Sequence, residues 1–124
     1  MIRIERFLAA ALVVASFGAQ AQDHQRYDPK ALARYDVSYV RCEAKFPEMK
    51  DHRDDAYLSL WRATLTPKSA AKLAEVRASA PYKAEHRVAS RRAAGASEPE
   101  ADKALERQCR GLWGEMKRMP KPAQ

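Results

Sequence analysis

Three histidines, two cysteines and one acidic cluster are the side chains of this sequence that could do chemistry. The histidines are His24, His52 and His86, and no two of them have the i, i+4 spacing of a helical metal pair. Cys42 and Cys109 have no neighbour at the C-x-x-C spacing of redox and zinc sites. G-x-S-x-G and glycine-rich phosphate loops are also missing. These absences favour a binding protein over an enzyme, and we expect no cofactor.

The acidic cluster is the stretch Asp51–Asp55, D-H-R-D-D, which sets one imidazole among three carboxylates. His52 and Asp55 share a face of a helix, where they could hold a hard metal ion or act as a general base. The alternative is that acidic side chains gather at a helix N-terminus because the helix dipole favours them there. This alternative is preferred, since a helix is expected to begin at this point. A small hydrolase or lyase using His52 or His86 is kept as a further hypothesis.

Residues 1–21 are typical of a secretory signal peptide. A basic start is followed by the apolar residues 7–18 and by Ala19-Gln20-Ala21, a small-x-small cleavage pattern. The twelve-residue apolar run would span about 18 Å as a helix, too little for a bilayer core of about 30 Å. We therefore predict cleavage after Ala21 and a periplasmic or secreted product that does not span the membrane.

Such cleavage would make His24 the third residue of the mature chain. A free amine, two amide nitrogens and this imidazole would form a square-planar set of four nitrogens that suits Cu(II) or Ni(II). Cyclisation of Gln22, the new first residue, would remove the amine. Metal binding by the mature N-terminus is therefore an alternative function, with His24 as its metal ligand.

Positive charge is concentrated in residues 68–92, which hold seven basic residues against two acidic ones. Residues 22–67, by contrast, hold eight of each. Within the basic stretch, Lys83, Arg87 and Arg91 are four positions apart and share one helical face. The predicted binding surface consists of Arg77, Lys83, His86, Arg87, Arg91 and Arg92.

A charge run of this kind is commonly a solvated helix face. The functional alternative is contact with an acidic envelope protein or an anionic envelope component. Nucleic acid is not an expected partner, because only Tyr82 could stack on bases in this segment. The low apolar content of residues 82–94 also predicts weak docking of this helix to the rest of the molecule.

The spacing of apolar residues predicts an all-α fold for residues 22–119, a small bundle of four to five helices, followed by a flexible tail at 120–124. Apolar residues recur at intervals of three and four rather than two. Helices are expected at 29–46, 52–65, 67–80, 82–94 and from about 98 to 119. Their predicted N-caps, where one is evident, are Asp28, Asp51, Thr66 and Ser97.

Both cysteines fall on apolar stripes, Cys42 in the first helix and Cys109 in the last. In an oxidising compartment two cysteines predict one disulfide, which would link these two helices. Trp61 and Trp113 lie on apolar stripes as well and are expected in the core.

The stretch Leu65–Ser69, L-T-P-K-S, resembles the L-T-x-x-Q motif of the envelope-stress chaperone family. Two of the three defined residues match, Ser69 replaces the glutamine, and the motif occurs once. The resemblance implies a small periplasmic helical binding protein. A Thr-Pro pair also suits the first turn of a helix in its own right.

Overall fold

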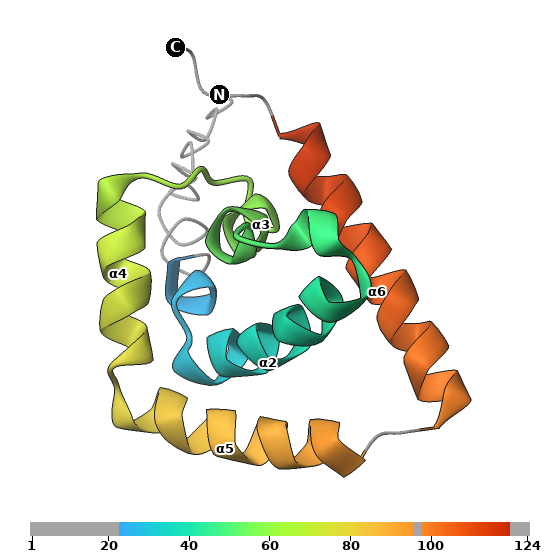
Figure 1. Cartoon of the computed structure of the whole chain (residues 1–124). Coiled ribbons are helices and arrows are strands. Elements are labelled where there is room, and N and C mark those ends of the chain that lie inside the picture. The colour runs from blue at the N-terminus through green and yellow to red at the C-terminus, as the bar shows by residue number, and fades with distance from the viewer. Residues whose placement is uncertain (1–22, 96–97, 120–124) are drawn as a thin grey trace, which may run out of the picture.

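The computed structural model describes residues 23–95 and 98–119, and every regular element among them is helical. The elements are α2 (Pro29–Lys45), the 3-10 turn η1 (Pro47–Met49), α3 (Arg53–Ser59), α4 (Pro67–Arg77), α5 (Ala80–Gly95) and α6 (Pro99–Arg118). In Figure 1, α4, α5 and α6 form three sides of a frame around α2 and α3. The predicted all-α fold is confirmed, but the helix count differs from the predicted four to five, because residues 23–26 are also helical and η1 was not predicted. The predicted signal peptide (1–21) and tail (120–124) lie outside the described residues.

Two helices begin where the sequence predicts, and for the predicted reason. Asp28 caps α2 by accepting a hydrogen bond from the Ala31 amide at 2.9 Å, with Pro29 in the first helical position. Thr66 caps α4 in a capping box, in which the Ser69 hydroxyl accepts from the Thr66 amide at 2.8 Å. The stretch L-T-P-K-S is therefore a helix start, which gives it a local structural explanation.

The other two predicted caps are not observed. The N-cap of α3 is His52, while Asp51 takes a left-handed backbone conformation with φ of 68°. At the start of α6, Glu98 precedes Pro99 and makes no capping bond, and the predicted cap Ser97 lies outside the described residues. Acidic side chains nevertheless occupy the first turns of both helices, where the helix dipole favours them.

The predicted end of the second helix, at residue 65, is wrong because α3 stops at Ser59. The Ala63 amide donates to the Leu58 carbonyl at 3.0 Å and the Arg62 amide to Ser59 at 3.1 Å. These two bonds form a Schellman motif, whose left-handed position is taken by Arg62 with φ of 53°. Glycine is the usual residue at that position, so the sequence carried no stop signal there.

Two apolar clusters make up the core, and α2 contributes to both. The first joins α2 to α3, α4 and α5 through Leu32, Ala33, Tyr57, Leu58, Leu73 and Tyr82. The second joins α2 to η1, α3 and α6 through Tyr39, Cys42, Met49, Ala56, Leu105 and Cys109. Trp61 packs against the first cluster and Trp113 against the second, and both are half-buried at the edge rather than inside the core.

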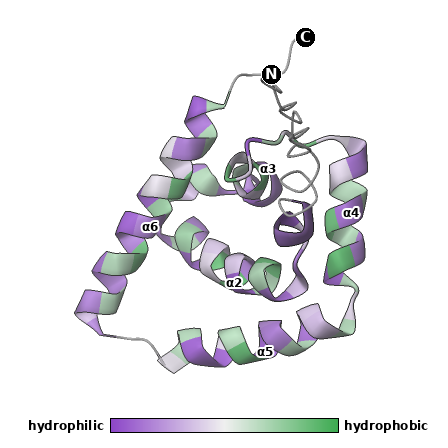
Figure 2. Cartoon of the chain, turned by 180° about the vertical axis from the view of Figure 1, so that it is seen from behind, coloured by the Kyte–Doolittle hydropathy of each residue, from purple (hydrophilic) through white to green (hydrophobic). Residues whose placement is uncertain are grey.

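The helix α5 packs along α2, contrary to the weak docking predicted from its composition. Tyr82 and Ala89 are its buried residues, and Glu85 pairs with Arg34 of α2 at 3.2 Å. Figure 2 shows hydrophilic and hydrophobic residues alternating along α5, as expected for a helix that buries one side. One aromatic ring, one small side chain and an ion pair therefore hold a helix whose composition alone suggested little attachment.

Four tyrosines in or beside the core donate their hydroxyls to acceptors in other segments of the chain. Tyr35 donates to the Arg53 carbonyl at 2.8 Å, Tyr39 to the Met49 carbonyl, Tyr57 to the Arg26 carbonyl and Tyr82 to the Asp36 carboxylate. Each bond joins two separate segments, and three of the four join residues 18 or more positions apart, so these hydroxyls help to fix how the elements sit on α2 and α3.

This arrangement predicts that the fold loses stability in alkali. Burial raises the pKa of Tyr57 and Tyr82 to about 12, whereas an unfolded tyrosine titrates near pH 10. The protonated tyrosines therefore stabilise the fold fully below about pH 10, and this contribution disappears as the pH rises through about 12. We expect tyrosinate absorbance and loss of helical circular dichroism to appear together in this range. Titration of all tyrosines near pH 10, with the helices intact, would contradict the prediction.

Candidate functional site

The predicted basic residues of α5 form an exposed row. Lys83, Arg87, Arg91 and Arg92 are exposed, and none of them takes part in an ion pair within the described ranges 23–95 and 98–119. Four residues of helix rise about 6 Å, so Lys83, Arg87 and Arg91 follow one another along one side of α5. We call these four side chains the cationic face of α5.

The only acidic residue of α5 does not neutralise this face. Glu85 turns toward α2, where it pairs with Arg34, and its side chain is 18 % exposed. His86, which was predicted to border the basic surface, is half-buried. Its Nδ1 lies 3.4 Å from the Ser90 hydroxyl, and its ring lies beside that of Tyr82. The positive charge of the face therefore rests on the four exposed cations.

Arg77 does not belong to the cationic face, although the sequence placed it there. Its Nε donates to Asp36 at 2.8 Å and its Nη2 to Asp54 at 2.8 Å, and its side chain is 16 % exposed. Burial alone would lower the pKa of Arg77, but the hydrogen bonds to two carboxylates raise it, so the guanidinium stays charged. Arg77 therefore ties α4 to α2 and α3 and is not available to a partner.

Asp36 is the partner that sequence reasoning missed, although its position carried a signal. It lies four residues after Leu32 and three before Tyr39 in α2, on the apolar stripe, and is 3 % exposed. A carboxylate at such a position needs a cation and hydrogen-bond donors to offset its loss of water. The position of Asp36 in the sequence therefore already indicated that a basic side chain must be its partner, and that partner is Arg77, one of the predicted surface arginines.

In the acidic stretch Asp51–Asp55, His52 and Asp54 are paired with other side chains. His52 Nδ1 lies 2.9 Å from Asp55 Oδ2, and Asp54 is held by two arginines. Burial would raise the pKa of Asp54, but hydrogen bonds from those arginines bring it below its usual value. In the part of the chain that the structure describes, no three His, Cys, Asp or Glu side chains are placed to hold a metal ion. The His52 ring meets Trp113 edge-on at 5.5 Å, which links α3 to α6.

His24 is the last of the predicted candidate residues, and a serine–lysine pair in α4 was not among the predictions. His24 is exposed, and the other nitrogen donors predicted for its metal site begin at Gln22, outside the described residues. Ser69 and Lys72 have the S-x-x-K spacing of some acyl-enzyme hydrolases. The Ser69 hydroxyl lies in the capping box of α4, while Lys72 Nζ lies 4.9 Å from the centre of the Tyr27 ring. Ser69 and Lys72 are thus engaged with different partners.

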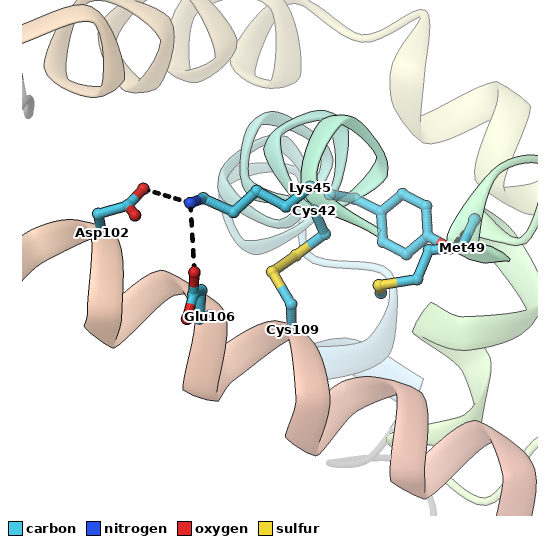
Figure 3. The surroundings of a disulfide bond; sticks show 7 residues. Cys42, Lys45, Met49, Asp102, Glu106 and Cys109 are labelled. Atoms are coloured by element: carbon cyan, nitrogen blue, oxygen red, sulfur yellow. Dashed lines mark hydrogen bonds and ion pairs between the residues drawn. A yellow bond between two sulfur atoms is a disulfide. The ribbon is translucent and has the colours of Figure 1, made fainter. Parts of the chain in front are cut away.

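The predicted disulfide is present and lies where α2 meets α6. Cys42 and Cys109 are both buried, with their Cα atoms 5.6 Å apart. Figure 3 shows Lys45 reaching across from α2 beside the disulfide, and its Nζ pairs with Asp102 and, at 3.6 Å, with Glu106. One covalent bond and two ion pairs therefore join the first long helix to the last.

A groove of about 440 Å³ lies beside the disulfide, between α2 and α6. Its lining includes Tyr35, Tyr39 and Cys42 from α2 and Gly111 and Leu112 from α6. Leu60, which directly follows α3, also lines it. The surface of the groove is mostly apolar. Nothing in the residue spacing indicated this groove, because it depends on how two helices cross.

No known protein family, curated protein or solved structure matches this chain. The resemblance of Leu65–Ser69 to the L-T-x-x-Q motif thus rests on these residues alone. Within residues 23–95 and 98–119, no helix combines the length and apolar character needed to cross a bilayer.

Proposed function

We propose that this chain is a small exported, periplasmic binding protein without catalytic activity, which attaches to an anionic partner through the cationic face of α5. The observation that carries the proposal is that Lys83, Arg87, Arg91 and Arg92 stand exposed and without ion pairs among the described residues, while Glu85 of the same helix faces inward. The disulfide supports export, because disulfides persist in oxidising compartments.

The small exposed residues within and beside the cationic face favour a phosphate-bearing envelope surface over an acidic protein as the partner. Ala80, Ala84 and Ala94 are exposed on α5, and none of them offers the large side chains that anchor protein interfaces. The exposed side also has no Trp, Phe or Leu that would insert into a bilayer. Attachment is therefore electrostatic, and it should weaken as salt screens the charges.

Charge reversal at two residues of this face should strongly weaken attachment to anionic lipid. A basic side chain near an anionic membrane contributes about 1 kcal/mol, so R87E/R91E should bind vesicles of phosphatidylglycerol at least about 30-fold more weakly than the wild-type protein. Co-sedimentation at low ionic strength measures this affinity, and phosphatidylcholine vesicles should retain neither protein.

The matched control is K50E/K68E, which changes the net charge by the same amount. Lys50 and Lys68 are exposed, lie outside α5 and make no ion pair among the described residues. This variant should keep most of the affinity. Equal losses in the two variants would show that net charge alone matters, and no binding to any vesicle would reject a phosphate-bearing surface. An acidic protein would then be the partner to seek.

The two alternative functions gain no support from the described geometry. A hydrolase or lyase would need His52 or His86 beside a reacting group, but His52 is engaged by Asp55 and Trp113, and His86 lies beside Ser90 and Tyr82. Binding of Cu(II) or Ni(II) through His24 depends on donors outside the described residues.

A further inference from the structure

The groove between α2 and α6 has the size and lining of a ligand site. Small-molecule sites in proteins typically measure about 300–1,000 Å³ and combine an apolar lining with a few polar groups, and this groove of about 440 Å³ falls in that range. Tyr35 and Leu112 are half-buried and supply apolar surface, and Leu60, at one side, is 47 % exposed. A Cβ built on Gly111 would meet no atom within 4 Å, so the groove is open at that point.

The charged residues of the groove leave one positive charge without a partner. Arg34 pairs with Glu85 at 3.2 Å, and Glu115 pairs with Arg118 at 2.6 Å. Arg107 also lines the groove, is exposed, and makes no ion pair within the described residues. The planar guanidinium of arginine presents paired donors that match a carboxylate. The charge of the groove therefore complements an anionic group beside an apolar one.

We propose that this groove binds an amphiphile with a single apolar chain and a carboxylate head. The chain lies against Tyr35, Leu60 and Leu112, and the carboxylate pairs with Arg107 at the edge. The site is separate from the cationic face of α5 and does not depend on the partner of that face.

Dodecanoate, titrated below its micellar concentration and followed by calorimetry, tests the proposal. The decisive variant is G111L, which fills the groove and should weaken dodecanoate binding by more than about tenfold. Its matched control is G114L, also inside α6 but not part of the groove lining, where a new Cβ meets only the Arg118 side chain at 3.7 Å. Both variants replace a helical glycine by a better helix former, so both should fold, and G114L should bind as the wild type does.

The head group is tested with R107Q. An exposed ion pair contributes up to about 1 kcal/mol, so this variant should bind dodecanoate about fivefold more weakly but bind an uncharged dodecyl maltoside unchanged. R87E/R91E should bind dodecanoate as the wild type does, which separates this site from the proposed function of α5.

Three results would overturn the proposal. The first is no binding of dodecanoate by the wild-type protein, and the second is an equal loss in G111L and G114L. The third is a dimer detected by light scattering that G111L dissociates, which would make the groove an interface between two copies of the chain.

Discussion

Reduction of the Cys42–Cys109 disulfide should lower the free energy of unfolding by about 4 kcal/mol. The bond closes a loop with a sequence separation of 67 residues, and the chain-entropy relation for disulfides gives this magnitude for a loop of that length. For a domain of this size, such a loss corresponds to a fall in the thermal midpoint of about 20 °C. Thermal and urea unfolding of the oxidised and reduced protein, followed by circular dichroism, measures the effect.

The position of α6 explains why the effect should be large. Leu105 and Cys109 are the fully buried residues of this helix, and its other apolar contacts, from Leu112, Trp113 and Met116, are half-buried, so the disulfide supplies the central attachment of α6. The variant C42A/C109A should match the reduced wild-type protein, and reductant should not change it further. Should the variant not fold, amide hydrogen exchange of the reduced wild-type protein provides the same test, with α6 exchanging first. A midpoint unchanged by reduction would contradict the prediction.

Replacement of Arg77 should lower the free energy of unfolding by about 3 kcal/mol. We expect this to be the largest loss from a single change at a charged position. Breaking a buried ion pair by removing one partner typically costs about 3–5 kcal/mol, because the other charge stays buried and unpaired. In R77M that charge is Asp36, which is 3 % exposed and keeps only the Tyr82 hydroxyl and the Arg53 guanidinium, at 4.0 Å, as partners. Leu73 is the buried residue of α4, so Arg77 also supplies much of what holds this helix in place. Urea unfolding of R77M measures the cost.

Two further variants separate the ion pair from its surroundings. R87M removes an exposed arginine of the cationic face and should change stability by no more than about 0.5 kcal/mol. The double variant D36L/R77M replaces both charges by apolar groups and should be more stable than R77M, because no charge remains buried alone. Equal stability of R77M and R87M would show that the network of Asp36, Asp54 and Arg77 contributes nothing.

Features governed by near neighbours in the chain were predictable from the residues. Asp28 and Thr66 start helices through bonds to amides three residues on, and each apolar stripe follows from the helical period. The disulfide was predictable too, since two cysteines allow one pairing and both lie on stripes that face the core. The end of α3 was not, because Arg62 occupies a left-handed position that the sequence marks with no glycine.

The candidate sites likewise combine features that local spacing predicts with features that depend on tertiary packing. The amino-acid order places Lys83, Arg87 and Arg91 on one side of a helix, because that relation depends only on the helical repeat. It does not say which cations remain free, because Arg77 pairs with carboxylates 41 and 23 residues away. The groove likewise needs side chains from α2, the end of α3 and α6. Free charge and open volume are set by residues that meet only when the helices pack, so packing, and not local spacing, left four cations on α5 and one groove beside the disulfide.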